Sequence, residues 1–311
     1  MRAKRSSGAA GLSIGSVRPV RPVNSHAGDG ARAGAPLAWR FVTGGGIGDT
    51  LIICYHGISE SWPSPSAIPV ERLERQLCHL LERGYRGTTF SEAVLSRPRG
   101  KTVAVTFDDA YRSIGEHAVP LLSRLGLPAT LFVPTHWVGR DTPMAWRGID
   151  RYVGGAHEAE LLPLSWAEIA SLSDAGWEIG SHTRSHPDLT TLSDDELGAE
   201  LAGSRADVEA RLGRPCRAIA YPYGFLDARV VRAAERTGYR TGAALPVRQH
   251  RRRALAWPRV GVFANDSDAR FIAKASPRRR WLVGSRIGEA LLRAPPIPRT
   301  TAGSSRAGAR A

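Results

Sequence analysis

Short apolar runs alternate with longer amphipathic segments over most of the chain. The clearest run, residues 103–107, is rich in β-branched side chains and ends at two adjacent carboxylates, Asp108 and Asp109. Similar runs cover residues 51–55 and 129–133. Because strands buried on both faces have this pattern, the runs predict a parallel sheet whose strands end at polar residues.

The segments between these runs carry the signals of helices. Residues 69–84 place leucines on one face and charged residues on the other, with proline at the start and glycine at the end. Residues 113–125 are predicted to be helical despite an internal proline. Serine followed three residues later by glutamate, at 165–168 and at 193–196, is the pattern of a capping box. A further helix is predicted over residues 227–237.

Strands and helices therefore alternate along the chain, with further strands predicted over residues 177–182 and 217–221. This alternation predicts parallel βαβ units, in which ligand groups gather at the carboxyl ends of the strands. The polar residues at those ends are His56, Asp108, Asp109, His182 and Tyr223. The pattern alone leaves two α/β folds open, a distorted (β/α) barrel and an open doubly wound sheet.

The composition divides the chain into a body and two basic ends. Residues 1–48 and 274–311 are rich in Gly, Ala, Arg and Pro without periodicity, which predicts a disordered leader and a low-complexity tail. The net charge is +14, of which the leader contributes +6 and the tail +8. The body, residues 49–273, is formally neutral and is predicted to be one catalytic domain. The charge distribution therefore gives no support for a basic nucleic-acid groove on the body.

The location of the protein is predicted from weaker signals. No apolar stretch reaches the 18 residues or so of a membrane span, and residues 9–17 are interrupted by glycine and serine, unlike a signal peptide. Residues 280–293 could form a basic amphipathic helix in peripheral contact with an anionic membrane, the alternative being a solvated tail. The three cysteines lack CxxC spacing and indicate no disulfide framework. We expect a cytoplasmic or membrane-peripheral protein.

One carboxylate and two imidazoles form a predicted metal-ligand set. His182 and His186 are four residues apart, a spacing that places both imidazoles on one side of a helical turn. With an aspartate they would bind a divalent ion and leave one position open for water or substrate. Zn²⁺ is the preferred ion, with Co²⁺ or Ni²⁺ as alternatives. From the residues alone, either Asp108 or Asp109 could be the carboxylate ligand.

Three motifs in this order resemble the polysaccharide deacetylases with a NodB-type catalytic domain, carbohydrate esterase family 4. They are TFDD at residues 106–109, HTRSHP at 182–187 and YPYG at 221–224. The resemblance covers roughly residues 49–265. It implies a distorted (β/α) barrel with fewer than eight repeats.

The resemblance also implies roles for individual residues. Asp109, His182 and His186 correspond to the metal ligands of the family. Asp108 corresponds to the general base that takes a proton from the attacking water. Tyr223 matches the position whose backbone N–H contributes to the oxyanion hole.

Two positions depart from the better-known family pattern. Ala220 and Tyr221 occupy the place where many relatives have an arginine that pairs with the base. Arg259, on the next predicted strand, could supply that charge instead. The late histidine that serves as general acid in many relatives is also missing. His56 and a water ligand of the metal are the two candidates for that role, although a core or surface position suits His56 equally well.

The sequence therefore predicts a metal-dependent hydrolase that removes acetyl groups from N-acetylated, or O-acetylated, sugars of a bacterial-type polysaccharide. Trp137, Trp146 and Tyr152, in the long connection 135–163, are predicted to form a rim that stacks on sugar rings. One alternative is hydrolysis of a small non-sugar amide, because the ligand set fixes the reaction type but not the acyl acceptor. Another is a non-catalytic carbohydrate-binding module, which the intact ligand set argues against.

Overall fold

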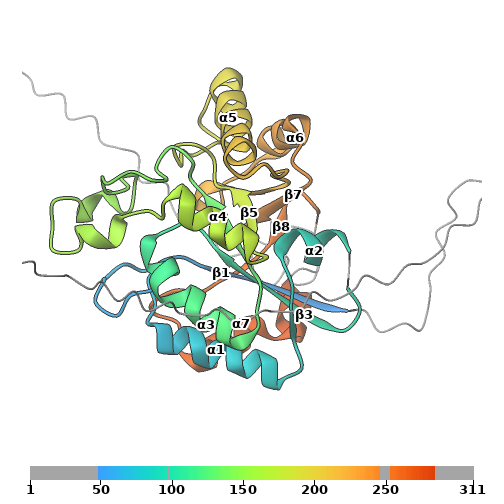
Figure 1. Ribbon diagram of the computed structural model, residues 1–311. Coiled ribbons are helices and arrows are strands. Elements are labelled where there is room, and N and C mark those ends of the chain that lie inside the picture. Colours follow the sequence, from blue (N-terminus) through green and yellow to red (C-terminus); the bar gives the residue numbers. More distant parts are fainter. Residues whose placement is uncertain (1–47, 97, 246–252, 284–311) are drawn as a thin grey trace, which may run out of the picture. The chain divides into compact units, whose positions relative to one another are not determined.

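The computed structural model describes residues 48–96, 98–245 and 253–283 (Figure 1). Within them, all the paired strands are parallel and belong to one sheet. The strands are β1 (Asp49–Tyr55), β2 (Arg86–Gly87), β3 (Lys101–Phe107), β4 (Ala129–Val133), β5 (Glu178–Ser181), β6 (Ala218–Ala220), β7 (Thr241–Ala244), β8 (Trp257–Pro258) and β9 (Val260–Gly261).

The order of these strands shows that the sheet is a nearly closed barrel. It runs β8-β7-β6-β5-β4-β3-β1-β9, with β2 added beside β3. The two end strands, β8 and β9, are separated in the chain by a single residue, Arg259. This arrangement confirms the predicted distorted (β/α) barrel and excludes the open doubly wound sheet.

Helices surround the barrel. Figure 1 shows α1, α3 and α7 on one side, whereas α4, α5 and α6 lie on another. The α-helices are α1 (Val70–Glu82), α2 (Phe90–Leu95), α3 (Val119–Leu125), α4 (Trp166–Asp174), α5 (Asp194–Leu212), α6 (Ala228–Thr237), α7 (Asp268–Ala275) and α8 (Pro277–Val283). A π-helical turn, η1 (Ile114–Ala118), precedes α3, and three 3₁₀ turns are η2 (Asp150–Tyr152), η3 (Glu158–Leu161) and η4 (Pro222–Gly224).

The local helix signals are confirmed. The side chains of Ser165 and Ser193 each accept a hydrogen bond from the backbone N–H of the glutamate three residues on. The carboxylate of that glutamate accepts a hydrogen bond from the backbone N–H of the serine. The helix predicted over residues 113–125 is present as η1 followed by α3. Pro120 lies in the first turn of α3, the position in a helix where proline is best tolerated.

Side chains alternate between the barrel interior and the outer layer beneath the helices. On β3, Val103 and Val105 join the main hydrophobic cluster under the helices. Ala104 belongs to a second, smaller cluster made by inward-facing residues of other strands. Because successive strand residues face opposite sides, Thr106 and then Asp108 are the next inward positions. The period of the strand thus directs one carboxylate into the barrel.

Helix α2 fills the amino-terminal end of the barrel interior. Its residues Phe90, Ala93 and Val94 belong to the inward-facing cluster. The carboxylate of Glu178, the first residue of β5, accepts a hydrogen bond of 2.9 Å from the backbone N–H of Ser91. Since this end of the barrel is filled, only the carboxyl end is left for a site.

The ends of the chain lie largely outside the described residues. This applies to residues 1–47 of the predicted leader and to residues 284–311 of the tail, including most of the predicted basic helix 280–293. The predicted boundary at residue 273 lies within α7, and Arg280 of α8 donates a 2.7 Å hydrogen bond to the carbonyl of Thr50 on β1. Cys54, Cys78 and Cys216 are free. In the described part of the chain, no helix has both the length and the apolar character needed to cross a bilayer.

The ring of Phe132 leaves no room for a side chain at Gly180 on β5. A Cβ at Gly180 would lie 2.6 Å from ring carbons of Phe132, so Gly180→Ala should lower the free energy of unfolding by about 1–3 kcal/mol. Gly198→Ala in α5 is the matched control. It has no neighbour within 4 Å, and we expect it to raise that free energy by up to about 1 kcal/mol. Urea unfolding measures both, and equal effects would contradict the packing described.

Candidate metal and catalytic site

The register of neighbouring strands brings residues of distant segments together at the carboxyl end of the barrel. Tyr55 on β1 pairs with Phe107 on β3, so the residues that follow them, His56 and Asp108, leave the sheet side by side. The N–H of His182, just after β5, donates a 2.8 Å hydrogen bond to the last residue of β4. His56, Asp108 and His182 therefore lie at the ends of strands, as predicted.

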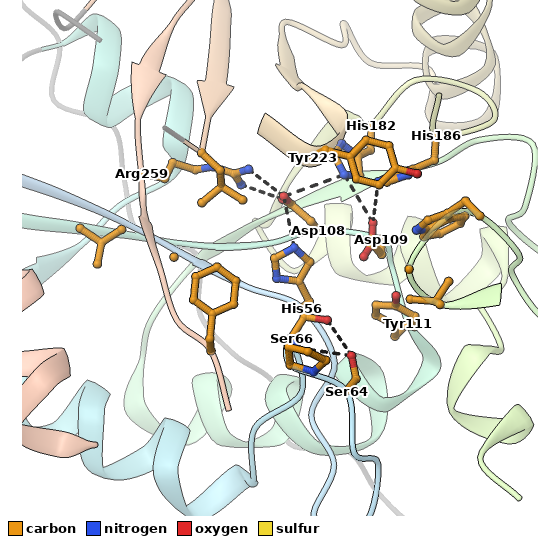
Figure 2. A pocket seen from close by; sticks show the side chains of 18 of the residues that line it. His56, Ser64, Ser66, Asp108, Asp109, Tyr111, His182, His186, Tyr223 and Arg259 are labelled. Atoms are coloured by element: carbon orange, nitrogen blue, oxygen red, sulfur yellow. Dashed lines mark hydrogen bonds and ion pairs between the residues drawn. The ribbon is translucent and has the colours of Figure 1, made fainter. Parts of the chain in front are cut away.

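Asp109, His182 and His186 meet at one buried point (Figure 2). Asp109 Oδ1 lies 3.4 Å from His182 Nε2 and 3.5 Å from His186 Nε2. One ligand atom from each of the three residues lies within 4.8 Å of the others. This is the set of residues that the sequence predicts as metal ligands.

The donor atoms of this set fit a divalent ion. Asp109 Oδ1 is buried and accepts no hydrogen bond from a described residue. His182 Nδ1 lies 2.8 Å from the carbonyl oxygen of Ala220, a contact that requires a proton on Nδ1 and leaves the lone pair of Nε2 directed at the site. A carboxylate and two imidazoles with open lone pairs suit Zn²⁺ or a similar ion.

The route by which the two histidines converge differs from the prediction. The spacing predicts a helical turn, and this is wrong, because residues 182–188 form neither helix nor strand. Instead, Thr183 and His186 adopt left-handed backbone conformations, with φ of 66° and 64°. These two turns bring the imidazoles together with their ring centroids 4.8 Å apart.

The two imidazoles have opposite pKa shifts. Burial lowers the pKa of His186 to about 3, even though Asp109 opposes this shift. Burial also acts against protonation of His182, but Asp108 and Asp109 outweigh it and raise the pKa of that imidazole. His186 is therefore neutral over the whole physiological pH range, which is the state in which an imidazole can bind a metal.

Asp108 has different partners from those of its neighbour Asp109. Arg259 donates two hydrogen bonds of 2.7 Å to it, Nη1 to Oδ1 and Nη2 to Oδ2, and all these groups are buried. Arg259 also donates to Thr106 Oγ1 at 3.0 Å. Burial alone would raise the pKa of Asp108, but Arg259 and then His182 outweigh burial and hold it well below its usual range. Asp108 is therefore ionised at neutral pH.

A second cluster of potential ligands, Cys54, His56 and Asp108, does not fit a cation. The Cys54 thiol donates to Asp108 Oδ2 at 3.4 Å, and His56 Nε2 lies 3.9 Å from the same oxygen. However, both oxygens of Asp108 already accept from Arg259, and its positive charge would repel a metal. Burial raises the pKa of the Cys54 thiol well above its ordinary value, so the thiolate ligand is also absent.

Tyr223 and His56 both border the reacting centre. The ring of Tyr223 lies edge-on to His186, 4.7 Å between centroids, and its backbone is left-handed with φ of 59°. Burial, followed by Asp109, raises the pKa of the Tyr223 phenol to about 12. His56 is half-buried, and its Nδ1 has no hydrogen-bond partner among the described residues. All seven residues predicted for the site line one cavity: His56, Asp108, Asp109, His182, His186, Tyr223 and Arg259.

This cavity has a volume of about 820 Å³ and shows which aromatic residues reach the site. Trp146 stacks on His186, 4.3 Å between centroids, and lines the cavity. Trp137 packs on Trp146, and Tyr152 packs on Trp62, so these two predicted rim residues contact other aromatic side chains of the protein.

Tyr111 is a residue of the site that the sequence analysis missed. Its buried hydroxyl lines the cavity and has no hydrogen-bond partner among the described residues, although Tyr111 follows the TFDD motif by only two residues.

Backbone strain is concentrated in the same loops. Among the described residues, five other than glycine have positive φ, and such conformations cost of order 1–3 kcal/mol each. They are Asp109, Ala110, Thr183, His186 and Tyr223. Because strain of this kind persists only where the surroundings enforce it, its location supports a functional role for these loops.

Comparison with known proteins identifies the family. The model of the polysaccharide deacetylase family matches residues 96–242, which contain all three motifs. Residues 96–242 are therefore identified as a polysaccharide deacetylase segment. Solved structures of family members share its fold. IcaB from Ammonifex degensii superposes with a TM-score of 0.59 at 24% identity, over 76% of this chain and 98% of that one. BC0361, a polysaccharide deacetylase from Bacillus cereus, gives 0.60 at 23% identity, over 73% and 69%.

The curated relatives of the chain include proteins of Bacillus subtilis and Staphylococcus aureus. The protein YxkH of Bacillus subtilis (strain 168) is 28% identical over 196 residues, 61% of this chain and 62% of that protein. The peptidoglycan-N-acetylmuramic acid deacetylase PdaA of the same strain is 26% identical over 169 residues, 54% and 53%. The poly-beta-1,6-N-acetyl-D-glucosamine N-deacetylase of Staphylococcus aureus (strain N315) is 24% identical over 195 residues, 58% and 61%. The chain thus spans less than two thirds of each relative's length.

The buried ion pair predicts a pH-dependent loss of stability. Arg259→Ala should lower the free energy of unfolding by about 3–5 kcal/mol at neutral pH, because it leaves a buried carboxylate unpaired. The loss should shrink as the pH falls. The variant's Asp108, with its pKa raised by burial, gains stability on protonation, whereas the wild type, with its depressed pKa, loses stability below the unfolded-state pKa.

Urea unfolding from neutral to mildly acidic pH measures this difference. Arg124→Ala is the control, because its ion pair with Glu74 is exposed and should contribute less than about 1 kcal/mol. A loss in Arg259→Ala that stayed constant with pH would contradict the ionised state assigned to Asp108.

Proposed function

We propose that this chain is a metal-dependent deacetylase that hydrolyses acetyl groups, N-linked before O-linked, on hexosamine units of a bacterial-type polysaccharide. The observation that carries the proposal is the meeting of two separate units at one cavity. One is the buried ligand set of Asp109, His182 and His186, and the other is Asp108, ionised and bound by Arg259. Hydrolysis of an amide needs both an electrophilic centre and a base.

The residues of the chain then divide the reaction between them. A divalent ion bound by the ligand set, Zn²⁺ by preference, would polarise the acetyl carbonyl and lower the pKa of a water molecule. Asp108 accepts the proton of the attacking water, and Arg259 keeps this carboxylate ionised and fixes its orientation. The backbone N–H of Tyr223 donates to the carbonyl oxygen as negative charge develops there. His56 protonates the amine as the C–N bond breaks, and acetate and amine leave.

The cavity and the relatives support a sugar substrate. The cavity volume of about 820 Å³ is within the range of sites that enclose ligands of several rings, and it exceeds what a small amide fills. Among the relatives, one is named for a polymer of N-acetylglucosamine and another for N-acetylmuramic acid of peptidoglycan. Both substrates carry an acetamido group on a hexose, which is the group the proposed reaction cleaves.

Acetate release from N-acetylglucosamine oligomers, with the protein loaded with Zn²⁺ or Co²⁺, tests this function. Asp108→Asn should lower kcat at least about 100-fold through loss of the base, with metal content unchanged. Asp174→Asn is the control, an exposed carboxylate on α4 that pairs with Arg214. His56→Gln should also lower kcat, and unchanged turnover would remove His56 from the mechanism.

Other outcomes of the same assay identify the alternatives. Acetate released only from small amides would favour the non-sugar hydrolase. Glycan binding with no acetate from any substrate would favour the non-catalytic carbohydrate-binding module, and the deacetylase proposal would be withdrawn.

A further inference from the structure

The cavity beside the metal ligands has an excess of positive charge. Among the described residues that line it, Asp108 and Asp109 alone are acidic, whereas six are arginine or lysine. Three of these six are compensated, since Arg259 pairs with Asp108, Lys274 with Asp266 and Arg280 with Asp49. Arg147, Arg151 and Arg279 form no ion pair with a carboxylate of the described residues. The body of the chain is formally neutral, so this excess is local.

Arg147 is presented by a turn with buried anchors on both sides. Trp146, before it, stacks on His186 of the ligand set, and Ile149, after it, is buried. The backbone N–H of Ile149 donates to the carbonyl of Trp146 at 3.1 Å and closes the turn. Between these anchors, the Arg147 side chain is exposed and lines the same cavity as Tyr223. The guanidinium therefore lies at the mouth of the reacting centre.

Arg151 is oriented by uncharged groups. Its guanidinium lies over the Tyr152 ring, 4.8 Å from the centroid, and donates to the Tyr152 hydroxyl at 2.9 Å. That hydroxyl donates in turn to the carbonyl of Pro63 at 3.0 Å. The nearby Asp150 carboxylate accepts the backbone N–H groups of Gly148 and Arg151 and forms an ion pair with neither guanidinium. Arg151 is thus positioned while its charge stays available to a ligand.

We propose that Arg147 and Arg151 form an anion subsite, so that the preferred glycan carries a carboxylate or a phosphate on a unit next to the one that is deacetylated. This inference rests on the proposed function and narrows its substrate class. A guanidinium presents a planar pair of donors that matches both anions. Neutral polymers of N-acetylglucosamine would leave the subsite empty.

The test compares oligosaccharides of equal length that differ in charge alone. One alternates N-acetylglucosamine with its 3-O-lactyl ether, which bears a carboxylate, and the second is the methyl ester of the first. For the wild type, we expect kcat/KM to be roughly tenfold higher for the carboxylate, a ratio that should fall as salt is added. A phosphorylated oligomer of the same length identifies which anion is preferred.

Variants locate the subsite. The double variant Arg147→Gln, Arg151→Gln should bring the ratio of the two kcat/KM values close to one. Arg232→Gln, an exposed arginine on α6 outside the cavity, loses one charge elsewhere and should keep the wild-type ratio. A wild type that prefers neither the carboxylate nor the phosphorylated oligomer over the neutral ester, or a double variant that keeps the wild-type ratio, would overturn the proposal.

Binding separates this inference from the proposed function. The same carboxylate and ester are titrated against the Asp108→Asn variant, with and without the two arginine substitutions. A preference for the carboxylate that requires Arg147 and Arg151 supports the subsite even if no acetate is released, and equal binding of the two oligomers overturns it. If the wild type releases acetate from no substrate, this contradicts the deacetylase function but not the anion subsite.

Discussion

The ion pair between Arg259 and Asp108 is the interaction on which the site depends. Arg259 is the single residue between β8 and β9, the two end strands of the sheet, and Asp108 follows β3 at an inward position. Two hydrogen bonds of 2.7 Å therefore join the closing point of the barrel to the reacting centre. A buried pair of this kind is stable only with both partners present, so closure of the barrel and orientation of the carboxylate occur together.

The same pair explains how adjacent aspartates take different roles. Asp108 continues the inward period of β3 and meets a guanidinium, which blocks a cation there. At Asp109 the backbone turns to a φ of 72°, and its carboxylate points to His182 and His186 instead. Packing beneath the pair supports the division. Gly180 leaves room for the Phe132 ring, and the Arg259 guanidinium lies 5.4 Å above that ring.

Much of this arrangement could be predicted from local signals, and the rest depends on contacts between distant segments. Apolar runs and capping boxes are signals that span only a few residues. The sequence therefore predicts the longer strands and the starts of α4 and α5 correctly. Strands β8 and β9 have only two residues each, too short for a periodic signal, and pair only because their neighbours are in place. The sequence predicts the types of residue in the ligand set. It does not predict the loop that joins His182 to His186, because the left-handed turns of that loop are enforced by surrounding contacts, such as the stacking of Trp146 on His186.

The most direct test of this account is the metal content of the purified protein after incubation with Zn²⁺. We expect about one ion per chain, lost in Asp109→Ala and in His182→Ala. Cys54→Ala, a change in the second cluster that Arg259 protects from cations, should keep the ion. Absence of metal from the wild type, or its loss in Cys54→Ala with retention in Asp109→Ala, would contradict the assignment of the site.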